Sequence, residues 1–325
     1  MDQQPTLVTG GAGYVGSILV AGLLASGRRV RALDSLLHGS VPSLLGAFGD
    51  DRFEFVAGDV RDAATVGRAV EGARDVVHLA AIVGDPACSR DPEAARAVNV
   101  DATVALLDAA EAAGVRRYLF ASTCSNYGKL DDPSLAATEE WELRPLSAYA
   151  ETKVGAELEV LARNRDGFET ACLRLATVYG TSPRMRFDLT VNEFARDVLL
   201  DGEVVVYGEQ FWRPYVHVRD AAAAFELALA APSAAVAGEV FNVGSTSENY
   251  RKLDIVELLQ ERLPSARATY VHRAEDPRDY RVSFDKIERV LGFACRHTVP
   301  DGIDEVLGLL RSGLLADPKA PVYRN

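Results

Sequence analysis

The sequence has few cysteines and no long apolar run. Its 325 residues include four cysteines, Cys88, Cys124, Cys172 and Cys295, and no two of them form a C-x-x-C pair. Their spacing therefore indicates neither a zinc site nor a redox motif. No stretch reaches 18 consecutive apolar residues, and Asp2 stands in an amino terminus that lacks the apolar region of a secretory signal. We expect a reduced, cytoplasmic chain that does not span a membrane.

Positive charge is also scarce. The chain has 47 acidic and 35 basic residues, for a formal net charge of -12. This sign disfavours a nucleic acid or an anionic membrane as the main partner, so an anionic ligand would need arginines gathered locally at its site. The five histidines fall in no ligand spacing, and we predict no metal. Charged residues at 25% and hydrophobic residues at 48% exclude the disordered and collagen-like classes.

Short apolar runs alternate with longer helical segments through the first half of the chain. The runs span residues 6–11, 29–35, 53–60, 75–81, 117–122 and 169–180, and between them apolar residues recur every three or four positions in segments 14–26, 62–71, 92–113 and 147–164. Strict alternation of strand and helix indicates a parallel sheet with helices on both faces. The sequence predicts an α/β fold with a doubly wound parallel Rossmann sheet.

This rhythm breaks near residue 180. Further strands are predicted at 202–208, 214–220 and 239–244, with helices at 221–231 and 253–263. We predict a Rossmann domain over residues 1–180, with segments near 214–244 returning to it. A smaller α/β carboxy-terminal domain, mainly over residues 181–325, is expected to bind the substrate.

A glycine-rich turn follows the first strand. Gly10, Gly11, Gly13 and Gly16 fit both G-x-G-x-x-G and G-x-x-G-x-x-G, and a helical segment follows them. Glycines there permit a tight turn and close approach to a pyrophosphate, and the helix amino terminus favours negative charge. Asp34 ends the second strand, where a carboxylate can accept the ribose hydroxyls and would repel the extra phosphate of NADP. NAD is the predicted cofactor; the alternative is that Asp34 only caps a turn.

Tyr149 and Lys153 lie four residues apart in the helical segment 147–164 and so share a helix face. The ammonium and the positive nicotinamide ring both favour a phenolate, so Tyr149 can take a hydroxyl proton while hydride leaves for the cofactor. Ser122 and Thr123 end the fifth strand, at the edge of the sheet where ligands bind. Either hydroxyl could bond the same substrate oxygen, or only cap the loop.

Taken in order, the motifs TGGAGYVG, Asp34, GDV (58–60), HLAA (78–81), NVDAT (99–103), STCSNYG, YAETK and RPYVHVRD resemble the extended short-chain dehydrogenase/reductase family, and within it the nucleotide-sugar epimerases and dehydratases. The resemblance covers nearly the whole chain. It implies that the cofactor contacts are Gly10, Gly13, Tyr14, Val15 and Gly16 at the pyrophosphate, Asp34 at the ribose, Asp59 and Val60 near adenine, Leu79, Ala80 and Ala81 along the dinucleotide, Asn99 as a brace of the loop after the fourth strand, and Lys153 at the nicotinamide ribose. It also implies that Thr123, Tyr149 and Lys153 form the catalytic group.

The same resemblance implies a nucleotide-diphosphate sugar as the substrate. The residues that it assigns to substrate binding are Asn192, Arg213 and Arg278, and we expect Cys124 and Thr177, where this chain departs from the family pattern, in the same site. For Cys124 the alternative is packing as a small residue, and Arg184 and Arg186 either assist at the diphosphate or are solvated. The family commonly dimerises through the helices that here span 92–113 and 147–164, so a homodimer is expected.

The residues after Thr123 bear on the reaction. The sugar 4,6-dehydratases of this family carry an Asp-Glu pair there, whereas this chain has Cys124 and Ser125, and the decarboxylases usually have a Glu in place of Ser125. These departures favour 4-epimerisation: Tyr149 deprotonates the carbon-4 hydroxyl, NAD takes hydride, and the hydride returns to the opposite face of the ketosugar. The alternatives are a 4-ketosugar reductase with the same residues, a dehydratase or decarboxylase, and a non-catalytic NAD-binding module.

Overall fold

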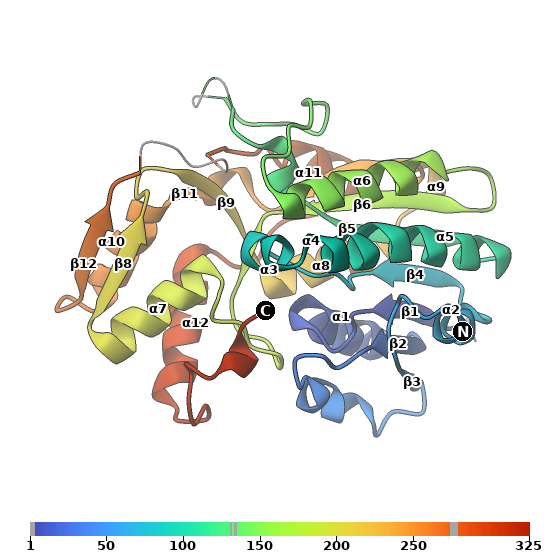
Figure 1. Cartoon of the computed structure of the whole chain (residues 1–325), viewed down its shortest axis with the longest axis horizontal. Helices are drawn as coiled ribbons and strands as arrows, with labels where there is room; N and C mark the ends of the chain where they lie inside the picture. Colours follow the sequence, from blue (N-terminus) through green and yellow to red (C-terminus); the bar gives the residue numbers. More distant parts are fainter. Residues whose placement is uncertain (1–3, 131, 133–134, 274–278) are drawn as a thin grey trace.

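A seven-stranded sheet, parallel throughout, forms the larger layer of the molecule in the computed structural model, which describes residues 4–130, 132, 135–273 and 279–325 (Figure 1). Its strand order is β10-β6-β5-β4-β1-β2-β3. The strands are β1 (Thr6–Thr9), β2 (Val30–Asp34), β3 (Phe53–Ala57), β4 (Asp75–His78), β5 (Arg117–Thr123), β6 (Glu169–Leu175) and β10 (Val240–Val243). The predicted doubly wound parallel sheet is confirmed.

Helices cover both faces of this sheet because its strands are apolar on both faces. Leu7 and Val76 pack into one hydrophobic cluster while Val8 and Val77, their neighbours in the strands, pack into another. The first cluster includes residues of α2 (Ala63–Val70), α5 (Ala102–Ala112) and α6 (Ala148–Ala162), and the second includes residues of α1 (Tyr14–Ala25) and α8 (Val218–Ala230). The segment predicted as one helix over 92–113 is divided into α4 (Pro92–Arg96), a π-helical turn (Ala97–Asp101) and α5, and α3 (Asp85–Arg90) precedes it.

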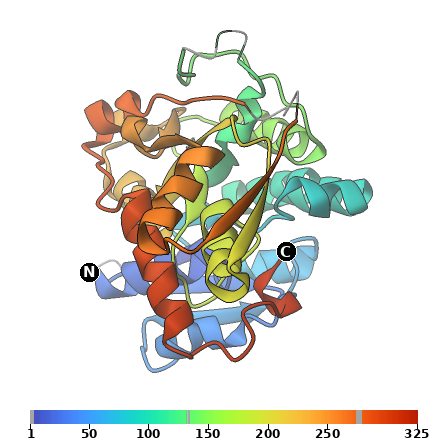
Figure 2. The same cartoon turned by 90° about the vertical axis from the view of Figure 1, so that its left-hand side faces the viewer.

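A smaller lobe with its own apolar core lies beside the sheet (Figures 1 and 2). It contains a three-stranded sheet of β7 (Thr177–Tyr179), β9 (Trp212–His217) and β11 (Asn249–Arg251), and a two-stranded sheet of β8 (Glu203–Tyr207) and β12 (Arg267–Val271). Its helices are α7 (Thr190–Asp201), α10 (Lys252–Arg262) and α12 (Val299–Arg311), while the short α9 (Ser233–Val236) and α11 (Asp285–Leu291) contact β6 and β10.

The apolar run 169–180, which the sequence predicts as a single strand, is divided between the two lobes. β6 pairs with β5 in the large sheet, and after Ala176 the chain continues as β7, which pairs with β9 in the smaller lobe. Of the later segments, β10 pairs with β6 and α8 packs on α1, whereas β9 belongs to the three-stranded sheet. The chain therefore passes between the lobes several times, and the carboxyl ends of β1, β4 and β5 face the smaller lobe (Figure 1).

Candidate active site

The glycine turn between β1 and α1 has the geometry of a phosphate-binding loop. Gly10 has φ +71°, and a Cβ there would lie 2.8 Å from the backbone nitrogen of Ala80. A Cβ on Gly16 would collide with the Gly10 carbonyl, so this glycine allows α1 to pack against the turn. Gly13 is the N-cap of α1, and no side chain caps its first turn. Amides at such a helix end suit the pyrophosphate of a dinucleotide.

Replacing Gly10 by alanine is expected to destabilise the protein by about 2–6 kcal/mol, because positive φ and overpacking each cost roughly 1–3 kcal/mol. The matched control is Gly67→Ala in α2, where a Cβ meets no atom within 4 Å. Alanine favours a helix interior over glycine, so the control is expected to be neutral or stabilising by up to about 1 kcal/mol. Urea unfolding of both variants measures the difference, and equal stability would contradict the steric role of Gly10.

Asp34 connects the glycine turn to the end of β2. Its Oδ2 accepts a hydrogen bond from the Ala12 amide at 3.0 Å, and its Oδ1 accepts one from the Leu36 amide at 2.8 Å. Each carboxylate oxygen keeps a further lone pair, so this turn-capping role is compatible with accepting ribose hydroxyls. Asp59, in contrast, is paired with Arg61 in its own turn at 2.6 Å, and that hydrogen bond holds the pKa of Asp59 below its usual value.

Asn99 holds the loop after β4. Its Oδ1 accepts from the Ile82 amide at 2.8 Å, and its Nδ2 donates to the Ile82 carbonyl at 2.9 Å and to Thr152 of α6 at 3.0 Å. At the start of this loop the Ala80 amide donates to the Thr9 hydroxyl of β1 at 3.3 Å. The loop is thus fixed between β1 and the helix that carries Tyr149.

Tyr149 and Lys153 lie on α6, whose first turn is capped by Ser147. Lys153 is 3% exposed, and its ammonium lies 4.5 Å from the centroid of the Phe120 ring. Burial lowers the pKa of Lys153 to about 8. Burial also raises the pKa of Tyr149 above its usual value, and the leading cation that opposes this rise is Arg186. Desolvation therefore outweighs the protein's own charges at the Tyr149 phenol. That Lys153 together with the positive nicotinamide ring favours the phenolate stays a prediction.

Thr123 ends β5 with its hydroxyl available to a substrate. Its Oγ1 accepts a hydrogen bond from the Ser125 amide at 3.1 Å, and its hydroxyl hydrogen has no acceptor among the residues that the structure describes. Ser122, the alternative, donates instead to the buried carboxylate of Glu157 at 2.5 Å. Ser122 is therefore part of the interior, and its assignment to a substrate oxygen is wrong.

Cys124 also lies in the interior, so its assignment to the substrate site is corrected. Its side chain has no exposed surface, its thiol donates to the Arg174 carbonyl at 3.2 Å, and burial raises its pKa. The side chain of Arg174 forms a buried ion pair with Glu157 at 2.5 Å and donates to the Tyr127 hydroxyl at 2.8 Å. This network packs behind β5 and holds the strand end from the inside.

Asn192 has no side-chain capacity left for a diphosphate, which corrects another prediction. It is fully buried, its Oδ1 accepts from the Gly180 amide at 3.0 Å, and its Nδ2 donates to the Tyr14 hydroxyl at 3.1 Å and the Arg186 carbonyl at 2.9 Å. The Tyr14 hydroxyl in turn donates to the Gly180 carbonyl at 2.5 Å. Asn192 and Tyr14 therefore join the loop after β7 to the first turn of α1.

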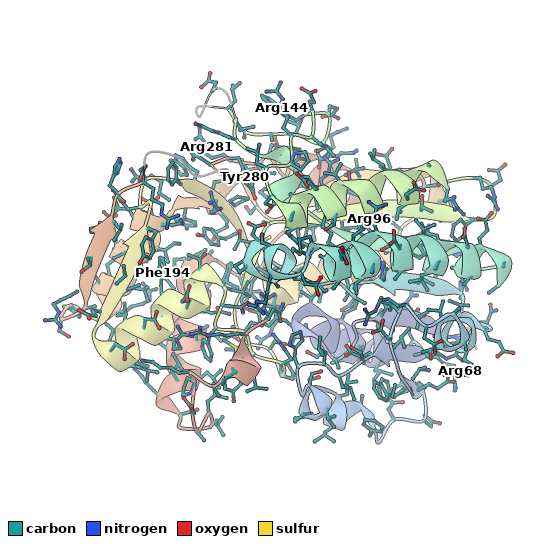
Figure 3. The ribbon with its side chains drawn as sticks, viewed as in Figure 1. Arg68, Arg96, Arg144, Phe194, Tyr280 and Arg281 are labelled. Atoms are coloured by element: carbon teal, nitrogen blue, oxygen red, sulfur yellow. The ribbon has the colours of Figure 1, made fainter. Side chains whose placement is uncertain are left out.

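Arg213 of β9 is connected to the end of β5 through Tyr280. The Arg213 guanidinium lies 5.8 Å from the centroid of the Tyr280 ring, and the Tyr280 hydroxyl lies 3.3 Å from the Ser125 hydroxyl. Tyr280 is labelled in Figure 3, above the large sheet and beside the start of α6. Tyr280 is a site residue that was not predicted from the sequence, although its place two residues after the predicted Arg278 was a signal.

Thr177 and Arg278 are the other two predicted substrate contacts. Thr177 is partly exposed on β7, and Arg278 lies outside the described residues. Within the ranges that the structure describes, no three His, Cys, Asp or Glu side chains gather so as to hold a metal ion. In the same ranges, no helix is long and apolar enough to cross a bilayer.

The site combines a Rossmann sheet with a glycine-rich phosphate loop, a carboxylate at the end of β2 and a Tyr-Lys pair on one helix. Together these features define a dinucleotide-dependent enzyme. Comparison with known proteins specifies the family. Residues 6–244 match the model of the NAD dependent epimerase/dehydratase family, so the chain belongs to this family and its cofactor is NAD.

Relatives of both reaction types are similar over nearly the whole chain. A UDP-glucose 4-epimerase of Mycolicibacterium smegmatis is 33% identical over 313 residues, covering 94% of this chain and 98% of the relative. A dTDP-glucose 4,6-dehydratase of Actinoplanes is 34% identical over 322 residues, covering 94% and 97%. The crystal structure of a dTDP-glucose 4,6-dehydratase from Streptomyces venezuelae with NAD bound has a TM-score of 0.85 at 30% identity, covering 95% and 97%.

Proposed function

We propose that this protein is an NAD-dependent nucleotide-sugar 4-epimerase. The observation that carries the proposal is the end of β5, where Thr123 has a hydroxyl hydrogen to donate and the next two positions have no acid-base pair. Cys124 is a buried thiol whose pKa is raised, and Ser125 lies within hydrogen-bond distance of Tyr280. Chemistry at one hydroxyl-bearing carbon needs one proton acceptor, and Tyr149 on the neighbouring α6 is the residue suited to it.

The protein residues would act on a single sugar oxygen. Tyr149 would take the proton of the carbon-4 hydroxyl and later return it, while Thr123 would donate a hydrogen bond to the same oxygen. Lys153, charged below a pKa of about 8, would hold the nicotinamide ribose and stabilise a phenolate once it forms. Bound NAD supplies a reversible hydride acceptor at carbon 4. Arg213, buried on β9 beside Tyr280, would bind the diphosphate from the smaller lobe.

The second candidate is a 4,6-dehydratase, which the 34% identity to the Actinoplanes enzyme favours. Elimination across carbons 5 and 6 needs a base for the carbon-5 proton and an acid for the leaving hydroxyl. At the positions after Thr123, the buried thiol of Cys124 and the hydroxyl of Ser125 are poorly suited to these roles near neutral pH.

NMR of UDP-, dTDP- and GDP-hexoses incubated with the purified protein in D₂O tests the proposal. We expect one of these sugars to equilibrate with its 4-epimer, without deuterium at carbon 5 and without NADH accumulating. A 4-keto-6-deoxy product that carries solvent deuterium would establish a dehydratase instead. Stoichiometric consumption of added NADH with a 4-ketosugar would establish a reductase.

A further inference from the structure

Arg184 lies on the loop after β7, which is fastened to the first turn of α1. The Ser182 hydroxyl donates to the Tyr14 carbonyl at 2.7 Å and lies 3.1 Å from the Ser17 hydroxyl. Together with the bond from Tyr14 to Gly180, these contacts hold a loop of the smaller lobe against the helix end that follows the glycine turn. Arg184 comes two residues after this attachment.

The Arg184 guanidinium is buried and only partly bonded. The residue is 6% exposed, and its Nη2 donates to the Arg324 carbonyl at 3.1 Å and to the Asn325 side chain at 2.8 Å. Its Nη1 is buried and has no hydrogen-bond partner within the described part of the chain. The neighbouring Arg186 differs, because it forms a two-bond ion pair with Asp188 at 2.7 and 2.9 Å. A buried guanidinium with an unused donor is costly unless an anion pairs with it.

The predicted ribose carboxylate, Asp34, is among the charges that act on Arg184. Burial and the neighbouring charge of Arg186 lower the pKa of Arg184 to about 10, although Asp188 and Asp34 oppose the shift. His38, in the loop after β2, lies within the field of the same two arginines, and burial with these charges lowers its pKa. Arg184 therefore lies within electrostatic reach of Asp34 while its own loop is attached to α1. The pyrophosphate of a dinucleotide joins these two places, because it binds at the helix end while its ribose binds the carboxylate.

We propose that Arg184 is a cofactor-binding residue that donates from the smaller lobe to a phosphate of the dinucleotide. The contacts of Nη2 with Arg324 and Asn325 fix the guanidinium and leave Nη1 for the phosphate oxygen. The dinucleotide would then be held by both lobes, as suits an enzyme that keeps its cofactor through the catalytic cycle. That benefit rests on the proposed epimerase function, but the binding contact itself does not.

Calorimetric titration with NAD⁺, ADP-ribose and UDP tests this assignment. A charge-assisted hydrogen bond is worth roughly 1.5–3 kcal/mol, so Arg184→Gln is expected to weaken NAD⁺ and ADP-ribose binding by about 10–100-fold. UDP binding to the NAD-saturated protein should change less than threefold. Arg184→Lys keeps the positive charge but loses the planar guanidinium group, so its NAD⁺ affinity should lie between that of the wild type and that of Arg184→Gln. The control is Arg262→Gln, an arginine of the same lobe paired with Asp304, which should leave both affinities unchanged.

Two results would overturn the assignment. The first is NAD⁺ affinity of Arg184→Gln within threefold of the wild type. The second is a loss for UDP as large as the loss for NAD⁺, which would move the contact to the diphosphate of the substrate. Circular dichroism measures whether the variants are folded. If Arg184→Gln does not fold, Arg184→Lys takes its place, and a NAD⁺ affinity of Arg184→Lys equal to that of the wild type also overturns the assignment. None of these measurements requires turnover, so failure of the proposed 4-epimerase reaction would be seen separately.

Discussion

Replacing Tyr149 by phenylalanine is expected to lower kcat by at least about 10²–10⁴-fold, the usual contribution of a positioned acid-base group. Phenylalanine keeps the ring and removes only the hydroxyl that takes the substrate proton. The NAD⁺ affinity should stay within threefold of the wild type, because the residues at the glycine turn and Asp34 are unchanged. Turnover is measured by NMR with whichever UDP-, dTDP- or GDP-hexose the wild-type protein converts, and NAD⁺ binding by calorimetry.

Tyr270→Phe is the matched control, since Tyr270 lies on β12 with 42% of its surface exposed. It loses the same hydroxyl and should retain full turnover. Turnover of Tyr149→Phe within tenfold of the wild type would remove Tyr149 from the proposed chemistry. A parallel loss of NAD⁺ binding and thermal stability would instead show that the hydroxyl has a structural role.

Lys153→Met is expected to abolish turnover and yet raise the free energy of unfolding at pH 7. Burial lowers the pKa of Lys153 from 10.5 to about 8, so the folded state binds this proton more weakly than the unfolded state. At 1.36 kcal/mol per pKa unit, the charged lysine costs about 2–4 kcal/mol at neutral pH. Loss of the contact with the Phe120 ring offsets about 0.5–2 kcal/mol. The difference is a net gain in stability of up to about 3.5 kcal/mol.

The pH dependence of this gain follows from the sign of the pKa shift. The penalty is complete below pH 8, decreases as the pH rises, and is gone above about pH 10.5, where lysine is neutral in both states. Urea unfolding of the wild type and the variant at pH 7 and at pH 10.5, without added cofactor, measures the difference. Lys319→Met, at an exposed ion pair with Asp201, is the control and should not be stabilising. A variant less stable than the wild type at pH 7 would contradict the prediction.

The orientation of the side chains at the end of β5 could not be predicted from the sequence. Ser122 and Thr123 are adjacent hydroxyl residues at one strand end, and the sequence does not distinguish which of them would bond a substrate oxygen. Successive side chains of a strand point to opposite faces, so only one of the two can face a given ligand. In the structure Ser122 is bonded to Glu157, whereas Thr123 retains a free donor. That choice depends on the partner that α6 presents, 35 residues away in the chain.

The same limit explains the correction at Asn192. The resemblance implied that Asn192 lies near the substrate diphosphate. In the structure its side-chain amide instead forms hydrogen bonds with Gly180, Tyr14 and Arg186. This residue of α7 therefore holds the loop after β7. For Arg184 the sequence allowed either a phosphate contact or a solvated position. In the structure Arg184 is buried and donates hydrogen bonds to Arg324 and Asn325.

By itself the sequence determined the parallel sheet, the phosphate loop and the Tyr149-Lys153 pair. All three depend on near neighbours in the chain: alternation of apolar runs, glycines within one turn, and four-residue spacing on a helix. Only the tertiary structure decided which loop of the smaller lobe meets α1, which hydroxyl of β5 remains free, and that desolvation dominates the pKa of Tyr149. These features depend on packing between segments far apart in sequence, because burial and unused hydrogen-bond donors exist only once those segments meet.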